Sequence, residues 1–359
     1  MPRRPPAAPT PRSRFVALAL LAVLTTGFFL PAAVAAHGAV PHDPPTFASL
    51  ILGWRFDPLI AVALAAAAIA WLVLVRRVGR AHPGNPIPAR RTAAFMGGLA
   101  AIAIALLSGI EQYDTTLFSI HMVQHLLLIL IAPPLLAYAA PVTQVLRVAS
   151  PAWRRRLVGV LHSGPISALS HPVVAWLTFT LVMWISHFSP LFDAALENRI
   201  VHDAEHAAYL AAGLLFWWPV VGADPAPRRL SYPVRALYVL LQMPPSSFLG
   251  MLITFATSPL YPHYATLGAP YGIDALADQE LAGGIMWVGG DVVLITAVLL
   301  IVAAWMRHEE RDTTAAERRV DAERARLRER ADVLALRRAG PDGQAGERPA
   351  GMGDSSSSR

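Results

Sequence analysis

The sequence contains no cysteine and few charged residues. Without cysteine, the 359-residue chain has no disulfide framework, no thiolate metal site and no catalytic thiol. Any metal ion must therefore be held by histidine, methionine, aspartate, glutamate or backbone oxygen. Only 15% of the residues are charged and 55% are hydrophobic, which is too apolar for an ordinary soluble domain. Together these properties indicate a membrane protein.

Lysine is also missing, so every basic residue is an arginine. The formal net charge of +6 raises the question of a nucleic-acid partner. The arginines, however, stand in short clusters between apolar runs, which is the pattern of membrane topology and not of a DNA-binding surface. We therefore expect no nucleic-acid partner.

The first apolar run, residues 15–36, follows several arginines and ends in small residues. A charged start, an apolar middle and a small-residue end are typical of a secretory signal peptide. We predict a signal peptide over residues 1–36, with an uncleaved first membrane helix as the alternative. Residues 37–57 would then form an extracytoplasmic N-terminal segment.

Seven further apolar segments have the length, roughly 17 to 25 residues, that a helix needs to cross a bilayer. The sequence therefore predicts an all-α, polytopic membrane helix bundle with seven transmembrane helices and a membrane domain over residues 58–306. The segments cover residues 58–75, 92–110, 116–138, 171–187, 200–221, 236–256 and 281–306.

The arginines between these segments predict the orientation. Twelve fall in one alternating set of connections and two in the other, so the positive-inside rule places the first set in the cytoplasm. We expect a multi-pass protein of the cell membrane, with its N-terminus extracytoplasmic after signal cleavage and its C-terminus cytoplasmic. The twelve are Arg76, Arg77, Arg80, Arg90, Arg91, Arg147, Arg154, Arg155, Arg156, Arg228, Arg229 and Arg235, and the two are Arg55 and Arg199.

Two further features concern the helices themselves. Proline pairs at 133–134 and 244–245 interrupt the third and sixth segments, where they predict kinks because proline removes a backbone donor. Beyond the last segment, residues 307–338 mix arginine with acidic residues three and four apart, which predicts a solvated cytoplasmic helix. Residues 339–359 are rich in glycine and serine, and we expect them to be disordered.

Two pairs of histidines stand four residues apart. His121 and His125 lie in the third segment, and His202 and His206 lie at the start of the fifth. A helix places such residues on one face. Ionisable side chains inside an apolar span are costly and usually functional. The predicted topology puts both pairs, with His187, on the outer side, opposite to the arginines.

Their depths in the membrane can be compared through the helix rise of about 1.5 Å per residue. On that estimate His125, His206 and Asp291 lie roughly 9 to 14 Å from the outer ends of their spans and could share one layer. A carboxylate such as Asp291 within a span needs a partner or a proton, so Asp291 is a candidate proton acceptor, metal ligand or hydrogen-bond partner that orients a ligating imidazole. Met251 and Met286 are further candidate metal ligands. A shallower ring would contain His121, His187, His202, Met183, Met251 and Met286.

Imidazoles and thioethers without thiolates suit copper, because histidine binds both copper oxidation states and methionine favours Cu(I). Zinc is the alternative, since histidines and a carboxylate would satisfy it. The methionines alone are a weak signal, because methionine at helical spacing usually fills a core.

At this point the sequence resembles a known family. The segments that carry the resemblance are SIHMVQHLLL (119–128) with APPL (132–135), WISHFSP (184–190), HDAEH (202–206), QMPP (242–245) and SPLY (258–261). They are similar to the multi-span CtaG family of cytochrome c oxidase assembly factors over roughly residues 50–306. A single-span periplasmic copper chaperone shares that name, but its cysteine pattern is missing from this chain.

The resemblance implies a membrane protein needed to mature haem-copper oxidase, with copper delivery to the catalytic subunit as the usual role. It implies that His121, His125, His187, His202 and His206 are the copper ligands. We expect oxidase subunits in the membrane, and an extracytoplasmic copper carrier, as partners, and no enzymatic activity. Two alternatives stay open: an intramembrane zinc hydrolase using His125, His206 and Asp291, and a haem-b carrier with two opposed histidines.

Overall fold

A computed structural model describes residues 41–225, 228–267 and 269–338 of the chain. Over these ranges the protein is helical and contains no β-strand, which confirms the all-α prediction. The predicted signal peptide (1–36), the first residues of the N-terminal segment and the predicted disordered tail (339–359) lie outside the described residues.

The helices vary from single turns to long membrane-crossing elements. Short helices cover both ends of the bundle, and two π-helical turns, η1 and η3, interrupt longer ones. In chain order they are α2 (Phe47–Leu52), α3 (Pro58–Ala81), α4 (Ala89–Leu107), α5 (Ile110–Tyr113), α6 (Phe118–Leu126), η1 (Leu127–Ile131), α7 (Ala132–Ala139), α8 (Pro141–Val148), α9 (Pro151–Leu161), α10 (Gly164–Leu169), α11 (Pro172–His187), α12 (Leu191–Glu197), α13 (Arg199–Val221), α14 (Tyr232–Leu240), α15 (Met243–Thr254), α16 (Pro262–Thr266), η2 (Pro270–Gly272), α17 (Ala275–Gly284), η3 (Ile285–Gly289) and α18 (Gly290–Arg338).

Five helical stretches in the described residues are long and apolar enough to cross a membrane. A sixth span is possible if α11 and α12, which meet at a bend of 67°, count as one. A polytopic bundle is therefore confirmed, but the predicted number of seven spans is not. The difference lies in α13, which has the length of a span but carries four ionisable residues in its first two turns.

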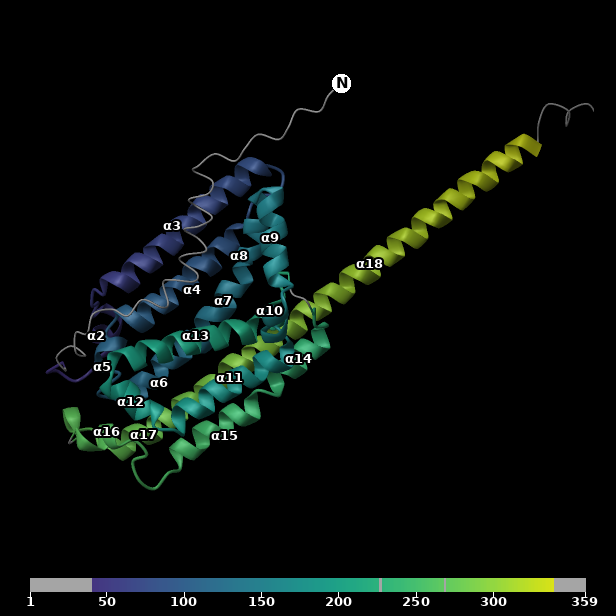
Figure 1. The fold of residues 1–359 in the computed structure, drawn as a ribbon. Helices are drawn as coiled ribbons and strands as arrows, with labels where there is room; N and C mark the ends of the chain where they lie inside the picture. Colours follow the sequence, from purple (N-terminus) through teal and green to yellow (C-terminus); the bar gives the residue numbers. More distant parts are fainter. Residues whose placement is uncertain (1–40, 226–227, 268, 339–359) are drawn as a thin grey trace, which may run out of the picture. The chain divides into compact units, whose positions relative to one another are not determined.

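Helix α13 packs one of its faces against α7, η1, α11 and α12. Figure 1 shows it running between α7 and α11. Its buried face includes Tyr209, Phe216 and Trp217, each at most 2% exposed. Polar side chains on this packed face meet other helices and not lipid, whereas Ile200, Ala204, Ala208 and Ala211 are exposed along another face of α13. That position explains why α13 tolerates polar residues.

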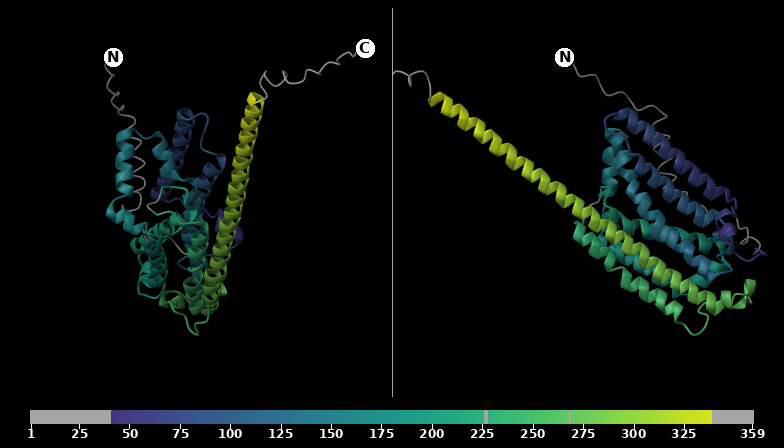
Figure 2. Two further views of the ribbon diagram at one scale, coloured as in Figure 1. Left: turned by 90° about the vertical axis from the view of Figure 1, so that its right-hand side faces the viewer. Right: turned by 180° about the vertical axis from the view of Figure 1, so that it is seen from behind.

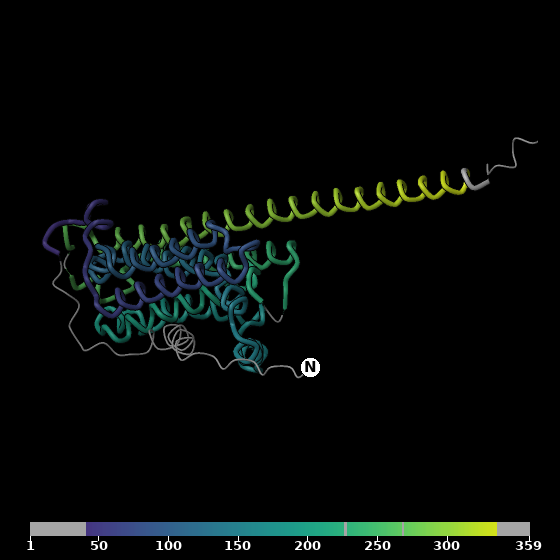
Figure 3. The backbone as a smooth tube through the Cα atoms, turned by 90° about the horizontal axis from the view of Figure 1, so that it is seen from above, coloured from purple at the N-terminus to yellow at the C-terminus, as the bar shows by residue number. Residues whose placement is uncertain are grey.

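Most of the long helices run lengthwise along the bundle in the tube view of Figure 3, whereas α9, which is upright in Figure 1, is seen nearly end-on. Helix α3 packs on α4 and α8 at the edge of the bundle, and the views in Figure 2 show it beside α4. Only 11% of its most apolar window is buried, so most of this helix faces outward. An apolar helix so little covered by protein fits a lipid-facing position.

Polar contacts link the connections between helices at each end of the bundle. The connections that are linked belong to the same side of the membrane in the predicted topology. At the end with few arginines, the Arg199 guanidinium lies 2.9 Å from a carboxylate oxygen of Asp57, the N-cap of α3. At the other end, the carboxylate of Asp224 accepts a backbone hydrogen bond of 2.6 Å from Thr143. Arg147 donates to Gln144 there, at 2.8 Å. These contacts fit the predicted topology; the side of the membrane that each end faces stays a prediction.

The predicted break at the first proline pair is compensated by a side chain. Pro133 lies in the first turn of α7, directly after η1. Proline cannot donate to the carbonyl four residues earlier, which belongs to Ile129. The indole N–H of Trp217 donates to that carbonyl instead, at 3.1 Å. A neighbouring helix thus satisfies the backbone group that proline leaves open, as membrane helices require.

The second proline pair opens a helix as well. Pro244 and Pro245 occupy the first turn of α15, directly after α14 ends. Proline is well tolerated in a first turn, because the N–H that it lacks would have no intrahelical partner there.

The chain divides into two units, Met1–Val302 and Ala303–Arg359. Helix α18 continues without a break through Met306, where the apolar segment was expected to end. Residues 307–335 are exposed, as predicted for a solvated helix. The sequence change at this point therefore alters the surroundings of the helix and not its secondary structure.

Gly213 allows α13 to approach η1 and α7 closely. A Cβ added there would lie 2.7 Å from both the Ile129 carbonyl oxygen and Pro133 Cγ. We expect Gly213→Ala to lower the free energy of unfolding by about 1–3 kcal/mol through overpacking. Gly79→Ala is the control, since its Cβ would meet nothing within 4 Å and alanine favours a helix by about 0.5–1 kcal/mol. Thermal unfolding midpoints in detergent should move in opposite directions; a shared direction would contradict the packing argument.

Candidate metal centre

Two histidines on α6 begin the centre. His121 and His125 lie one turn apart on the same helix face, and both are buried. Their Nε2 atoms are 2.9 Å apart. Two nitrogens at that separation can share a proton in a hydrogen bond. They can also both reach one ion at about 2.0–2.1 Å, the usual zinc–imidazole distance.

A tyrosine determines which nitrogen of His121 carries the proton. The hydroxyl of Tyr264 donates to the backbone carbonyl of Asp114 at 2.6 Å. That hydroxyl can then only accept from His121 Nδ1, which lies 3.1 Å away. Since Nδ1 is the donor, the lone pair of His121 lies on Nε2, the atom that faces His125. Metal-binding histidines typically donate their other N–H in this way.

Helix α13 supplies the second pair. His202 and His206 are 1% and 5% exposed, and their ring centroids lie 4.1 Å apart. The His202 ring is 5.2 Å from that of His121, and the His206 ring is 6.2 Å from that of His125. The structure therefore brings the two predicted pairs together in one buried layer.

Gln124 ties the two pairs to each other. Its amide nitrogen donates to Glu111 at 2.7 Å and to the carbonyl of Ala105 at 3.0 Å. Its oxygen is therefore the atom that accepts from His206 Nε2, at 3.1 Å. The lone pair of His206 consequently lies on Nδ1. A residue that could have been simple packing thus fixes the orientation of a candidate ligand.

Two carboxylates face the imidazoles. Asp114 lies 3.7 Å from His202 Nε2, and Glu205 lies 3.8 Å from His125 Nε2. No hydrogen bond of normal geometry reaches the carboxylate oxygens of either residue from the described part of the chain. Asp114, in the turn between α5 and α6, is 1% exposed, and this burial raises the pKa of its carboxyl to about 8. A cation that replaces the proton would stabilise the ionised form of such a buried carboxyl group.

His187 stands at the edge of the centre. Its Nδ1 donates to the carbonyl of Met183 at 2.8 Å, so its lone pair lies on Nε2. That Nε2 is buried and receives no hydrogen bond from the described residues. The His187 ring lies 6.0 Å from the His125 ring. The residue can join the centre only after a shift of side chains.

Three sets of side chains among the described residues place one ligand atom each within 4.8 Å of one another. All three sets are buried or nearly so, and four of the five histidines predicted as ligands belong to them. The sets are His121, His125 and His206; Asp114, His202 and His206; and His121, His202 and Glu205.

The other predicted ligands lie elsewhere. The carboxylate of Asp291 accepts from the hydroxyl of Ser247 at 2.8 and 3.0 Å, and it joins none of the three sets. The serine supplies the partner that a carboxylate within a span requires. Met286 is buried in the apolar core, in η3, and Met251 is partly buried in α15. A role for these methionines as thioether ligands stays a prediction.

Asp114, Glu205 and Gln124 were not among the predicted ligands. Glu205 stands between the histidines of the second pair, three residues after His202. On a helix this spacing places the two side chains close together. Asp114 lies in the short connection before the third segment, where a carboxylate usually reads as solvated. A signal for Asp114 was available, because the predicted topology puts it on the same side of the membrane as all five histidines.

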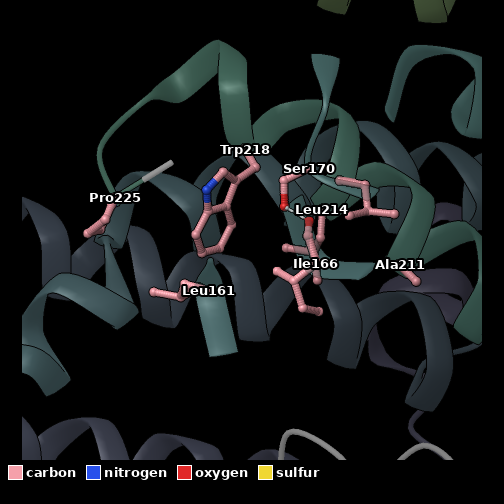
Figure 4. Close-up of a pocket in the computed structure, with 8 residues that line it drawn as sticks. Leu161, Ile166, Ser170, Ala211, Leu214, Trp218 and Pro225 are labelled. Atoms are coloured by element: carbon pink, nitrogen blue, oxygen red, sulfur yellow. Dashed lines mark hydrogen bonds between the residues drawn. The ribbon is translucent and has the colours of Figure 1, made fainter. Parts of the chain in front are cut away.

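A separate groove lies away from the histidines. Its cavity volume is about 380 Å³, and Figure 4 shows its apolar lining beside the indole of Trp218. The hydroxyl of Ser170 donates to the carbonyl of Ile166 at 2.6 Å, so it is not aimed into the groove. Such a surface suits acyl chains better than a polar ligand. The residues lining it are Leu161, Ile166, Ser170, Ala211, Leu214, Leu215, Trp218 and Pro225.

Fold and centre define a polytopic α-helical membrane protein with a buried layer of histidines and carboxylates. Residues 69–308 match the family described as cytochrome c oxidase caa3 assembly factor (Caa3_CtaG). This match covers most of the chain and every residue of the centre, so the chain belongs to that family. The resemblance seen in the sequence is thereby confirmed.

Similar curated proteins come from mycobacteria. The chain is 33% identical over 317 residues to the uncharacterized protein Mb0105 of Mycobacterium bovis and to the uncharacterized protein MT0111 of Mycobacterium tuberculosis. Each alignment covers 85% of this chain and 48% of the relative. The uncharacterized protein ML1998 of Mycobacterium leprae is 32% identical over 291 residues, with 78% and 43% covered. The chain thus spans about half the length of these relatives. No solved structure matches it.

The hydrogen bonds of Tyr264 lead to a stability prediction. Tyr264→Phe leaves His121 Nδ1–H and the Asp114 carbonyl buried without this partner, so we expect a loss of about 1–3 kcal/mol in the free energy of unfolding. Tyr238→Phe is the matched control, since the Tyr238 hydroxyl is buried without a hydrogen bond among the described residues. We expect it to change stability by less than about 1 kcal/mol. Equal losses in thermal or denaturant unfolding would show that the Tyr264 hydroxyl does not support the centre.

Proposed function

We propose that this chain binds copper in the buried histidine centre and delivers it to the catalytic subunit of cytochrome c oxidase during assembly. Its family connects it to oxidase assembly. The observation that supports metal binding is the convergence of histidines from α6 and α13 with two carboxylates whose oxygens lack donors. Its partners would be oxidase subunits in the membrane and an extracytoplasmic copper carrier.

The ligand types favour copper over other metals. The centre offers imidazole nitrogens with few oxygens and no thiolate, a set that suits copper and zinc far better than magnesium or calcium. Between these two, nitrogen sites generally bind Cu(II) more tightly than zinc. The ligand atoms lie close together but do not surround a single ion position. Such an arrangement suits a metal ion that is bound and released again better than a permanent structural ion.

Burial of the centre determines how an ion would leave it. His121, Gln124 and His202 are at most 1% exposed, so bulk water does not hydrate an ion at this depth. The ion must pass from ligand to ligand, because a bare ion in an apolar bundle is prohibitively costly. Delivery sideways to another membrane subunit needs only successive replacement of histidines by ligands of the recipient.

The zinc hydrolase is the less favoured alternative. It requires Asp291 beside His125 and His206, whereas the Asp291 carboxylate is satisfied by Ser247. A stoichiometric bound zinc with hydrolysis of a lipid amide would support it over copper delivery. A haem-b carrier would show a Soret band in the purified protein, and a colourless preparation would exclude it.

Copper binding can be tested by metal analysis of the purified chain after copper loading. We expect about one copper per chain, and its loss when His121, His125, His202 and His206 are all replaced by alanine. The matched control replaces four exposed histidines, His42, His82, His162 and His308, and should retain the metal. Equal copper in the two variants would contradict metal handling by this centre.

Delivery is tested in cells of the native host whose own copy carries the same substitutions. We expect the oxidase from cells with the four central substitutions to lack copper, measured as metal per oxidase complex. Cells with the exposed-histidine variant should assemble a normal enzyme. A fully metallated oxidase alongside a copper-free centre would show that the chain assists assembly in another way.

A further inference from the structure

Any two of the three ligand sets share a single residue. His206 belongs both to the set with His121 and His125 and to the set with Asp114 and His202. All these residues are at most 5% exposed, so both sets lie within the protein interior. The centre therefore offers two positions for an ion, and the two positions have one ligand in common.

The hydrogen bond to Gln124 makes the two positions mutually exclusive. Because the Gln124 oxygen accepts from His206 Nε2 at 3.1 Å, the ring has one lone pair, on Nδ1. One lone pair binds one ion at a time. A second cation nearby would also be repelled strongly in a medium of low dielectric constant. The centre should hold one ion, in either position.

The two positions differ in chemistry. The set that contains His121, His125 and His206 consists of three neutral imidazoles. Such a set suits Cu(I), a singly charged ion, without an anionic side chain. The other set replaces one imidazole by the carboxylate of Asp114, a harder and anionic ligand that favours a divalent ion. Asp114 is itself 1% exposed, and no hydrogen bond of normal geometry reaches its oxygens within the described ranges. That observation points to a cation independently of the histidines.

The order of the positions follows from the helices. Asp114 precedes α6, and His202 lies one turn nearer to the start of α13 than His206. His125 lies one turn further into α6 than His121. The set with Asp114 is therefore closer to the helix ends, and we name it the outer position. The set with His125 is the inner position.

The third set connects the two positions. His121 comes from the inner position and His202 from the outer position, and their ring centroids are 5.2 Å apart. Glu205, whose carboxylate oxygens lack donors, completes this set. An ion in transit can thus keep at least two protein ligands at each stage.

We propose that the centre is a relay in which an ion binds first at the outer position and then moves to the inner position by ligand exchange around His206. Asp114 and His202 are replaced by His121 and His125, and the oxidation state of the ion does not change. This relay rests on the proposed copper-binding function and adds an order of events and a residue, Asp114, that the predicted ligands lacked.

The relay is tested with two probe ions on the full chain in detergent. Cu(I) affinity is measured by competition with a chromogenic chelator, and Co(II) binding by its visible absorption. We expect Asp114→Asn to weaken Co(II) at least about tenfold, since even outer-shell partners are worth 10–100-fold, and to change Cu(I) affinity less than about threefold. We expect His125→Gln to do the reverse, and His206→Gln to weaken both ions.

Loading kinetics test the order. The initial rate of Cu(I) uptake by Asp114→Asn should fall about tenfold although its equilibrium affinity for Cu(I) is retained. Asp203→Asn is the control, because this carboxylate lies on α13 next to His202 but outside the three sets, and it pairs with Arg199 at 3.6 Å. It should load like the unmodified chain. If Asp114→Asn fails to fold, His202→Gln tests the outer position in its place.

The outcomes separate the relay from the proposed function. An unmodified chain that binds no copper would contradict the function itself. An unmodified chain that binds copper, with Asp114→Asn and His125→Gln weakening both ions equally, would show a single position and overturn the relay. An unchanged loading rate in Asp114→Asn, with Co(II) binding lost, would overturn the order of the positions.

Discussion

Donation of imidazole N–H groups to fixed acceptors is the constraint on which this centre depends. A histidine inside an apolar bundle must place its N–H on an acceptor, or its burial costs stability. His121 donates to Tyr264, His206 to Gln124 and His187 to the carbonyl of Met183. These acceptors come from different helices, so the fold determines the orientation of these three rings. Because the N–H groups point outward, the lone pairs of His121 and His206 remain for the interior of the centre. Packing and metal affinity thus have the same structural cause.

Much of the fold could be predicted because membrane helices follow from apolar length and charge distribution. The apolar runs and the exposed helix after Met306 correspond to observed elements, and both proline pairs lie in the first turn of a helix. Apolar length cannot distinguish a lipid-facing helix from one enclosed by protein. Helix α13 shows this limit, since its first turns are polar and one of its faces packs against α7, η1, α11 and α12. The number of spans therefore could not be fixed by composition alone, and the predicted seven is not confirmed, since five or six stretches of the described residues are long and apolar enough to cross a membrane.

The centre was predictable to the extent that it consists of pairs on regular helices. Spacing of four residues placed His121 with His125 and His202 with His206, and similar depth predicted that the two pairs would meet. Depth carries no information about rotation around the helix axis. For that reason Asp291 could be assigned the same layer as His125, although its carboxylate pairs with Ser247 on α15. Asp114 lies in a turn, where no periodicity indicates the direction of the side chain.

The π-helical turn η1 separates the histidine-bearing end of its helix from the proline-bearing end. A π turn takes in one residue more than an α-helical turn, and one residue corresponds to about 100° of rotation. Shortening Leu127–Ile131 by one residue would therefore turn His121 and His125 away from α13 while Pro133 kept its place against Gly213. The direction in which His121 and His125 point is thus set by the π-helical turn η1 that follows them in the chain. Any redesign of the centre that regularised this helix would lose the site without altering a single ligand.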